Sequence, residues 1–224
     1  SLDTKNSHVW IHNMDLFYGK KGSAADQAKG DGTVDIKGDS KYVTVAYNRF
    51  WDNGKASMCG MKSETGENWI TYHHNWFDHS DSRMARVRTM SVHMYNNYYQ
   101  HCDVYGIGAT SGSSIFMESN YFDAVKRPIM SSLQGTDAKG DGTFSGEKGG
   151  LIKAYGNVFA NKPDNFSYIT YAENNTSFDA YEVSNPSEQV PASVKTLVGG
   201  TSYNNFDTNS SLMYAYAADK AEDV

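Results

Sequence analysis

The chain has 224 residues and a formal net charge of −6, and it contains neither a block of Lys and Arg nor an apolar run long enough to cross a membrane. We therefore expect no nucleic acid and no membrane as a partner. Hydrophobic residues make up 39% of the chain, with 16 Tyr, 20 Gly and only 4 Pro, which favours a single β-rich domain over residues 1–224.

One strand pattern, with alternating apolar and polar residues, recurs along the chain. Its copies read HVWIHNMDL, YVTVAYNRF, WITYHHNWF, SVHMYNNYY, SIFMESNYF and LIKAYGNVF. The first copy has Met14 and Leu16 where each later copy has an Asn two residues before an aromatic residue. Those later pairs are Asn48/Phe50, Asn75/Phe77, Asn97/Tyr99, Asn120/Phe122 and Asn157/Phe159.

The spacing of these Asn residues indicates a solenoid, because successive Asn lie 27, 22, 23 and 37 residues apart and loops of variable length can separate stacked coils. A second, shorter apolar series lies between the copies, so each coil contributes at least two strands. The sequence thus predicts an all-β fold, a right-handed parallel β-helix with coils over about 6–160 and an irregular tail over about 161–224 packed on the outside. The chain opens directly in a strand, and we expect the first coils of the solenoid to be missing.

The recurring Asn is expected at a corner of each coil, in the left-handed region of backbone angles and hydrogen-bonded to its copies above and below. In the third copy, His73 and His74 precede Asn75. Neighbouring residues of a strand point to opposite faces, so we expect these two histidines not to share a metal ion. A zinc site formed by His73, His74 and His79 is therefore disfavoured.

The segment DGTVDIKG contains a candidate metal site. Val34 and Ile36 face the core, which turns Asp35 outward, and Asp31 lies on the same face. Gly30 and Gly32 allow the chain to bend so that both carboxylates meet. Two carboxylates suit Ca²⁺ but fall short of its six to eight ligands, so water, substrate or other residues would supply the rest. The alternative is that both are solvated loop acids.

Basic residues follow on the next coils. Lys55 and Arg83 occupy nearly the same place on adjacent coils, and in RMARVR the inward Val87 leaves Arg86 and Arg88 outward beside the row of Asp35. A row of cations next to an acid pair on an exposed sheet would suit a polyanionic sugar chain. The alternative is an ordinary solvated basic patch.

The blocks VWIHNMDL, GTVDIKG, NGKASMCG, NWITYHHNWF, SRMARVR and SVHMYNNYY, in this order, resemble the pectate lyases of polysaccharide lyase family 1. The resemblance implies calcium-dependent β-elimination on polygalacturonate, giving unsaturated oligogalacturonides. By position, it implies Asp31 and Asp35 as Ca²⁺ ligands, Arg83 as the proton-abstracting base, and Lys55 and Arg88 as residues that hold the substrate carboxylate. It also implies a secreted or periplasmic enzyme, which we expect to be a monomer.

The family carries further calcium-binding aspartates on coils upstream of the first block, and this sequence lacks those coils. Two other classes stay open at this stage: a β-helix polygalacturonase-type glycoside hydrolase, which would use paired carboxylates, and a non-catalytic polysaccharide-binding β-helix. Pectin lyase is disfavoured, because Asp35, Lys55 and Arg88 suit a charged substrate rather than a methyl ester.

Overall fold

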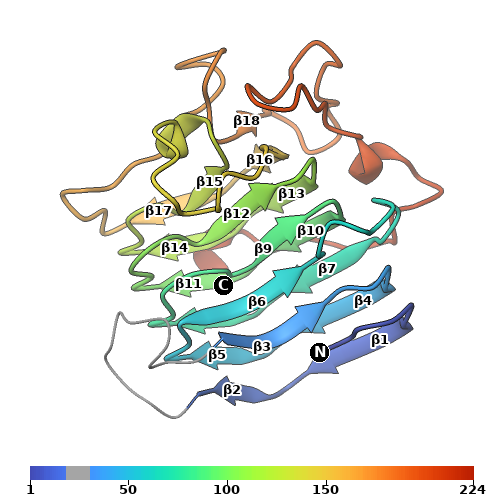
Figure 1. Ribbon diagram of the computed structural model, residues 1–224. Coiled ribbons are helices and arrows are strands. Elements are labelled where there is room, and N and C mark those ends of the chain that lie inside the picture. Colours follow the sequence, from blue (N-terminus) through green and yellow to red (C-terminus); the bar gives the residue numbers. More distant parts are fainter. Residues whose placement is uncertain (19–30) are drawn as a thin grey trace.

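The computed structural model describes residues 1–18 and 31–224, with Asp31 described by its backbone alone. In this part of the chain, short strands pair in parallel and form three sheets that run along one solenoid (Figure 1). The parallel β-helix predicted from the repeats is confirmed.

Each sheet takes one strand from every coil, and strands that are neighbours in space are not neighbours in sequence. Sheet A contains β3 (Asp31–Ile36), β6 (Lys55–Cys59), β9 (Arg86–Arg88), β12 (Ile107–Thr110) and β15 (Ile129–Ser131). Sheet B contains β1 (Ser7–His12), β4 (Lys41–Ala46), β7 (Ile70–His73), β10 (Ser91–Tyr95), β13 (Ser114–Glu118), β16 (Leu151–Tyr155) and β18 (Tyr181–Glu182). Sheet C contains β2 (Asp15–Phe17), β5 (Arg49–Trp51), β8 (Trp76–Asp78), β11 (Tyr98–Gln100), β14 (Tyr121–Asp123) and β17 (Val158–Ala160).

The repeated aromatic residue of each coil forms a stack inside the solenoid. Strand pairing in sheet C keeps the equivalent positions in register from coil to coil. Neighbouring rings lie with their centroids 4.5 to 5.3 Å apart, in the order Phe50, Phe77, Tyr99, Phe122 and Phe159. A single coil could not bury such a ring, so the stack makes the stability of each coil depend on its neighbours.

The predicted Asn ladder is present at the corner between sheets B and C. The side-chain amide of each Asn donates to the Oδ1 of the next, over 2.9 to 3.0 Å, through Asn48, Asn75, Asn97, Asn120 and Asn157. The expectation that these Asn adopt left-handed angles is wrong, because the residue before each of them does so instead. These residues are Tyr47 (φ 55°), His74 (51°), Asn96 (49°), Ser119 (49°) and Gly156 (63°).

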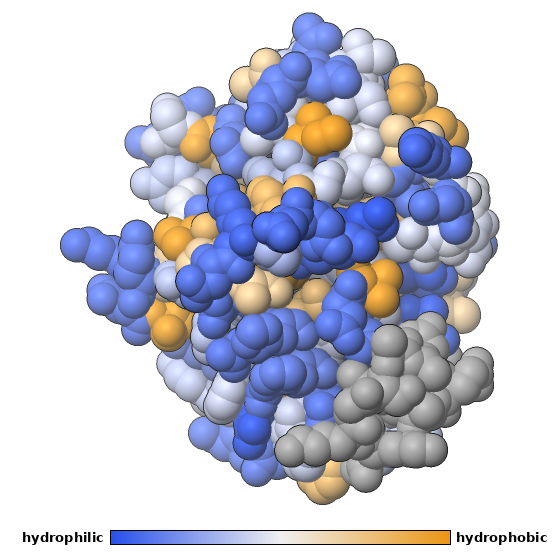
Figure 2. Space-filling view, turned by 90° about the vertical axis from the view of Figure 1, so that its left-hand side faces the viewer, coloured by the Kyte–Doolittle hydropathy of each residue, from blue (hydrophilic) through white to orange (hydrophobic). Residues whose placement is uncertain are grey.

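The interior of the solenoid is apolar. Both cysteines are free and buried there, and burial raises the pKa of the Cys59 thiol to about 12, so it stays protonated and packs as a small apolar residue. The face seen in Figure 2 differs from this interior, since it is mostly hydrophilic with small, separate apolar spots.

After residue 160 the chain first closes the end of the solenoid, where β18 pairs with β16 and Ala180 packs into the core, and its later part then runs as an irregular outer tail, as predicted, along sheet B (Figure 1). Its short helical turns are η2 (Phe206–Thr208) and η3 (Ala221–Asp223), while η1 (Gly135–Asp137) lies in an earlier loop. A second apolar cluster joins the tail to outward side chains of β13 and β16: Phe116, Leu151, Phe178, Val190, Val194, Tyr203 and Phe206.

Candidate active site

The outer face of sheet A brings the predicted site residues onto consecutive coils. In the strand register, Asp35 of β3 pairs with Met58 of β6, and Met58 pairs with Arg86 of β9. The backbone of Lys55 pairs with Asp31 on one side and with Ser82 on the other. Arg83, the residue after Ser82, therefore lies next to Lys55 on the neighbouring coil. Neighbouring parallel strands lie about 4.8 Å apart, and the predicted acids and cations therefore share one face of the solenoid.

The alternation of side chains in these strands follows the prediction. Ile36, Cys59 and Val87 form one register row and are completely buried in the solenoid. The residues on either side of each must then point outward, which places Asp35 and Arg86 in an outward row. The side chain of Arg88, two residues after Arg86, points outward from the same face.

The start of β3 contains an irregularity next to Asp35. The register shifts between Asp31 and Val34, and Gly32 adopts φ +75°. A Cβ at Gly32 would lie 2.6 Å from Oδ2 of Asp35, so the glycine leaves the room that the Asp35 carboxylate occupies. The side chain of Asp31 lies outside the described residues, and the predicted meeting of the two carboxylates is not tested.

The fit of Ca²⁺ to this corner is partial. The carboxylate oxygens of Asp35 are hard ligands of the type that Ca²⁺ prefers, but one carboxylate supplies at most two of about six to eight ligands. Among the described residues, no three His, Cys, Asp or Glu side chains are placed to hold one metal ion. The donor type fits, and the remaining ligands would come from Asp31, substrate or water.

A loop over residues 132–150 covers the far part of sheet A. The Phe144 ring packs on Gly108 of β12, where a Cβ would lie only 2.5 Å from the ring, and stacks edge-on with Tyr105. Phe144 also accepts a hydrogen bond from Arg86 through its carbonyl oxygen, at 2.9 Å. This loop makes Arg86 only 3% and Arg88 only 9% exposed, whereas the sequence predicted an open, flat sheet. That expectation was wrong for these two arginines.

Glu147 of the same loop is the residue that the sequence prediction missed. Its carboxylate lies 2.9 Å from Nε of Arg88, 3.2 Å from Arg86 and 3.2 Å from Nζ of Lys62, and it accepts hydrogen bonds from the hydroxyls of Thr110 and Ser111. Burial alone would raise the pKa of Glu147, but the hydrogen bond from Arg88 and the charge of Arg86 outweigh it and lower the pKa to about 2. Glu147 is therefore ionised.

The three arginines of this segment act on one another. Burial lowers the pKa of Arg86, and the charges of Arg88 and Arg83 lower it further, while Tyr105 and Glu147 act in the opposite direction. Burial also raises the pKa of Tyr105 to about 12, although Arg86, Arg83 and Arg88 favour its ionisation. The three arginines thus lie near Tyr105, and Arg86 and Arg88 also pair with Glu147.

The histidine pair lies elsewhere, on the outer side of sheet B. The two rings do not point to opposite faces as expected, because His74 adopts φ 51° at the corner and brings its Nδ1 within 2.9 Å of Nδ1 of His73. His74 also pairs with Asp219 of the tail at 3.1 Å. Burial, followed by the charge of His74, lowers the pKa of His73 to about 4, so His73 is neutral at pH 7.

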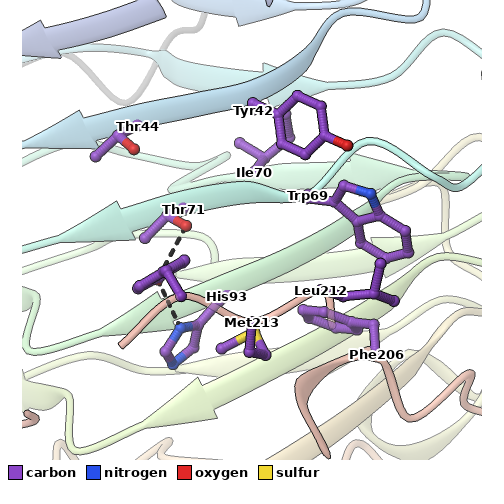
Figure 3. Close-up of a pocket in the computed structure, with 10 residues that line it drawn as sticks. Tyr42, Thr44, Trp69, Ile70, Thr71, His93, Phe206, Leu212 and Met213 are labelled. Carbon is purple, nitrogen blue, oxygen red and sulfur yellow. Dashed lines mark hydrogen bonds between the residues drawn. The ribbon is translucent and has the colours of Figure 1, made fainter. Parts of the chain in front are cut away.

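An apolar cavity of about 130 Å³ lies where the tail crosses sheet B (Figure 3). Thr71 donates a hydrogen bond to the hydroxyl of Tyr214, and Nδ1 of His93 lies 2.9 Å from the same hydroxyl. Trp69, Phe206 and Leu212 line one end of the cavity. This lining suits packing of the tail rather than a polyanion, and the cation row of sheet A remains the candidate active site.

Comparison with known proteins shows which family the chain resembles. The sequence model of the pectate lyase family matches residues 2–154. A pectate trisaccharide-lyase from Bacillus licheniformis is 31% identical over 131 residues, which cover 58% of this chain and 38% of that protein. The chain thus spans well under half the length of this curated relative.

Solved structures of pectate lyases share the fold. A pectate lyase from Bacillus sp. N165 in complex with trigalacturonate is 28% identical, with a TM-score of 0.54 over 72% of this chain and 51% of that one. Pectate lyase C from Erwinia chrysanthemi, with Ca²⁺, is 24% identical, with a TM-score of 0.64 over 98% of this chain and 55% of that one.

In the described residues, no helix is long and apolar enough to cross a membrane. The family match covers more than half of the chain and includes the strands that carry Asp35, Lys55 and Arg88. This chain therefore belongs to the pectate lyase family.

Proposed function

We propose that this protein cleaves polygalacturonate by calcium-dependent β-elimination and releases unsaturated oligogalacturonides. The observation that carries the proposal is the register of sheet A, in which Asp35 shares an outward row with Arg86 and Lys55 lies beside Arg83. The basic side chains would bind the carboxylates of a polyuronate directly, and a metal cation held by the acid would bridge to them. The proposal places the enzyme where polymeric pectate occurs, outside the cell or in the periplasm.

In this proposal, Lys55 and Arg88 hold the carboxylate of the sugar unit that reacts. The trigalacturonate bound to the Bacillus sp. N165 relative supports a galacturonate polymer as the substrate. Ca²⁺, when held by Asp31, Asp35 and the uronate, would supply a further positive charge beside that carboxylate. The Ca²⁺ present with the Erwinia chrysanthemi relative supports this assignment.

Arg83 is the proposed base, and its neutral form takes the proton from C5, next to the carboxylate. The electron pair of the C5–H bond becomes the second bond between C4 and C5, the bond from C4 to the glycosidic oxygen breaks, and that oxygen takes up a proton. Negative charge develops on the carboxylate meanwhile, where Lys55 and Arg88 stabilise it. A guanidinium in water loses its proton only above about pH 12, so an arginine base favours alkaline conditions.

The two competing classes are less well supported by the site. A glycoside hydrolase requires a pair of carboxyl groups about 5 to 9.5 Å apart. The acids that the sequence offers for such a pair are Asp31 and Asp35, and the side chain of Asp31 lies outside the described residues; Glu147 is already bound by Arg86, Arg88 and Lys62. A purely binding β-helix would not need Arg83 as a base, and an assay for product separates it from a lyase.

Ultraviolet absorbance of the C4–C5 double bond tests the proposal. The purified full-length protein should produce this absorbance from polygalacturonate in the presence of Ca²⁺, lose it in excess chelator, and regain it when Ca²⁺ is restored. New reducing ends without the absorbance would identify a hydrolase instead. Binding of polygalacturonate with neither product would identify a non-catalytic module.

A further inference from the structure

Glu147 is held more firmly than a surface acid on a loop would be. Its side chain is 8% exposed, and three cations and two hydroxyl groups surround it. It is 59 residues away from Arg88 in the sequence, so the fold alone brings them together. The contact with Arg88 uses both carboxylate oxygens, at 3.1 and 2.9 Å from the same Nε.

This contact decides where the rest of the Arg88 side chain points. With Nε held by Glu147, the Nη1 of Arg88 lies 2.8 Å from Sδ of Met58 on the neighbouring strand β6. Met58 is the register partner of Asp35, and Lys55 begins the same strand. The outer end of the guanidinium is therefore turned from β9 toward the coils that carry Lys55 and Asp35.

We propose that Glu147 is a positioning residue of the proposed lyase: it holds Arg88 by Nε so that the outer nitrogens of the guanidinium face the uronate carboxylate. The inference rests on the proposed function. It assigns to the insertion loop over residues 132–150 a part in binding the substrate, although Glu147 does not itself touch it.

The physical reason is that Arg86 and Arg88 repel each other and have little access to water. Without Glu147, both guanidinium groups would lose a buried counter-ion, and Arg88 would gain rotamers that point away from the groove. Preorganised donors stabilise developing charge better than mobile ones do. Replacing residues that orient metal ligands typically changes affinity or activity about 10- to 100-fold, and we expect a loss of similar size for a residue that orients Arg88.

The same contact could instead inhibit substrate binding. The Glu147 carboxylate could occupy the place on Arg88 that a uronate carboxylate needs, and its removal would then increase activity. The positioning role and the blocking role of Glu147 predict opposite changes in activity for Glu147→Gln, a substitution that preserves the size of the side chain but removes its charge.

The test measures kcat and KM on polygalacturonate for the wild type, Glu147→Gln and, as a matched control on the same loop, the exposed Asp141→Asn. We expect Glu147→Gln to raise KM and to lower kcat/KM about 10- to 100-fold. Asp141→Asn should stay within about two-fold of the wild type, as surface substitutions do. Glu147→Asp retains the charge and guards against loss of the fold; its shorter side chain should still raise KM.

A double-mutant cycle separates positioning from general stability. If Glu147 acts through Arg88, adding Glu147→Gln to Arg88→Ala should change kcat/KM no further. Independent, additive effects of the two substitutions would overturn the inference, as would an unchanged or increased kcat/KM in Glu147→Gln. A wild type that yields no unsaturated product would instead overturn the proposed function, and the inference with it.

Discussion

The Nζ of Lys153 lies 2.6 Å from Oδ2 of Asp207, and neither side chain is reached by solvent. Lys153 points outward from β16, and Asp207 belongs to η2 in the tail. Lys153 also donates to the carbonyl oxygen of Pro186, and the hydroxyl of Tyr203 donates to the other oxygen of Asp207. This pair fixes the irregular tail to the regular stack of sheet B.

Replacing Lys153 by Met should reduce the free energy of unfolding by about 3–5 kcal/mol, because the Asp207 carboxylate would stay buried without its cation. Chemical denaturation monitored by tryptophan fluorescence measures this loss. The exposed Lys195→Met in the tail serves as the control and should change stability by less than about 0.5 kcal/mol. Equal losses in the two variants would show that the buried pair does not anchor the tail.

The Asn ladder gives a second prediction about stability. Asn97→Ala would leave the buried amide of Asn75 and the carbonyl oxygen of Tyr72 without the partners that Asn97 now supplies. We expect a loss of at least about 2 kcal/mol, since each buried polar group left unsatisfied costs about 1–3 kcal/mol. Asn165→Ala, at an exposed position after the last coil, should lower stability far less in the same denaturation experiment.

Much of the fold could be predicted because the same strand pattern recurs several times along the chain. The repeated Asn and aromatic positions identify the coils, and strand stacking then fixes the register without further information. The backbone angles at the corners were harder to predict. A corner needs one left-handed residue, but the sequence does not say whether the ladder Asn or its predecessor adopts that conformation, and His74 shows the consequence for side-chain direction.

The site could be predicted only where it follows the coils. Asp35, Lys55 and Arg88 lie on the short strands that recur from coil to coil in sheet A, so the stacking of coils brings them to one face. Glu147 lies in an insertion, which the spacing of 37 residues between Asn120 and Asn157 reveals, but the path of an insertion does not follow from a repeat. The same limit explains why the low exposure of Arg86 and Arg88 was not foreseen.

The lowered pKa of Glu147 predicts how stability depends on pH. Ion pairing stabilises the charged form in the folded state and moves the pKa from an ordinary value of 4.5 to about 2. The stabilisation is therefore complete above pH 4.5 and is lost as the pH falls toward 2. Wild type should exceed Glu147→Gln in melting temperature at pH 6, and the gap should narrow steadily below pH 4.5. A gap that stays constant down to pH 3 would contradict this assignment.

The central claim is that the cation row of sheet A carries out β-elimination with Arg83 as the base. Its most direct test is the formation of the double-bond absorbance from polygalacturonate at alkaline pH by Arg83→Ala, with circular dichroism as a check on the fold. Arg49→Lys on sheet C, which retains its charge, is the control and should cleave like the wild type. We predict that Arg83→Ala folds normally but forms no unsaturated product, whereas product formation at the wild-type rate would contradict the account.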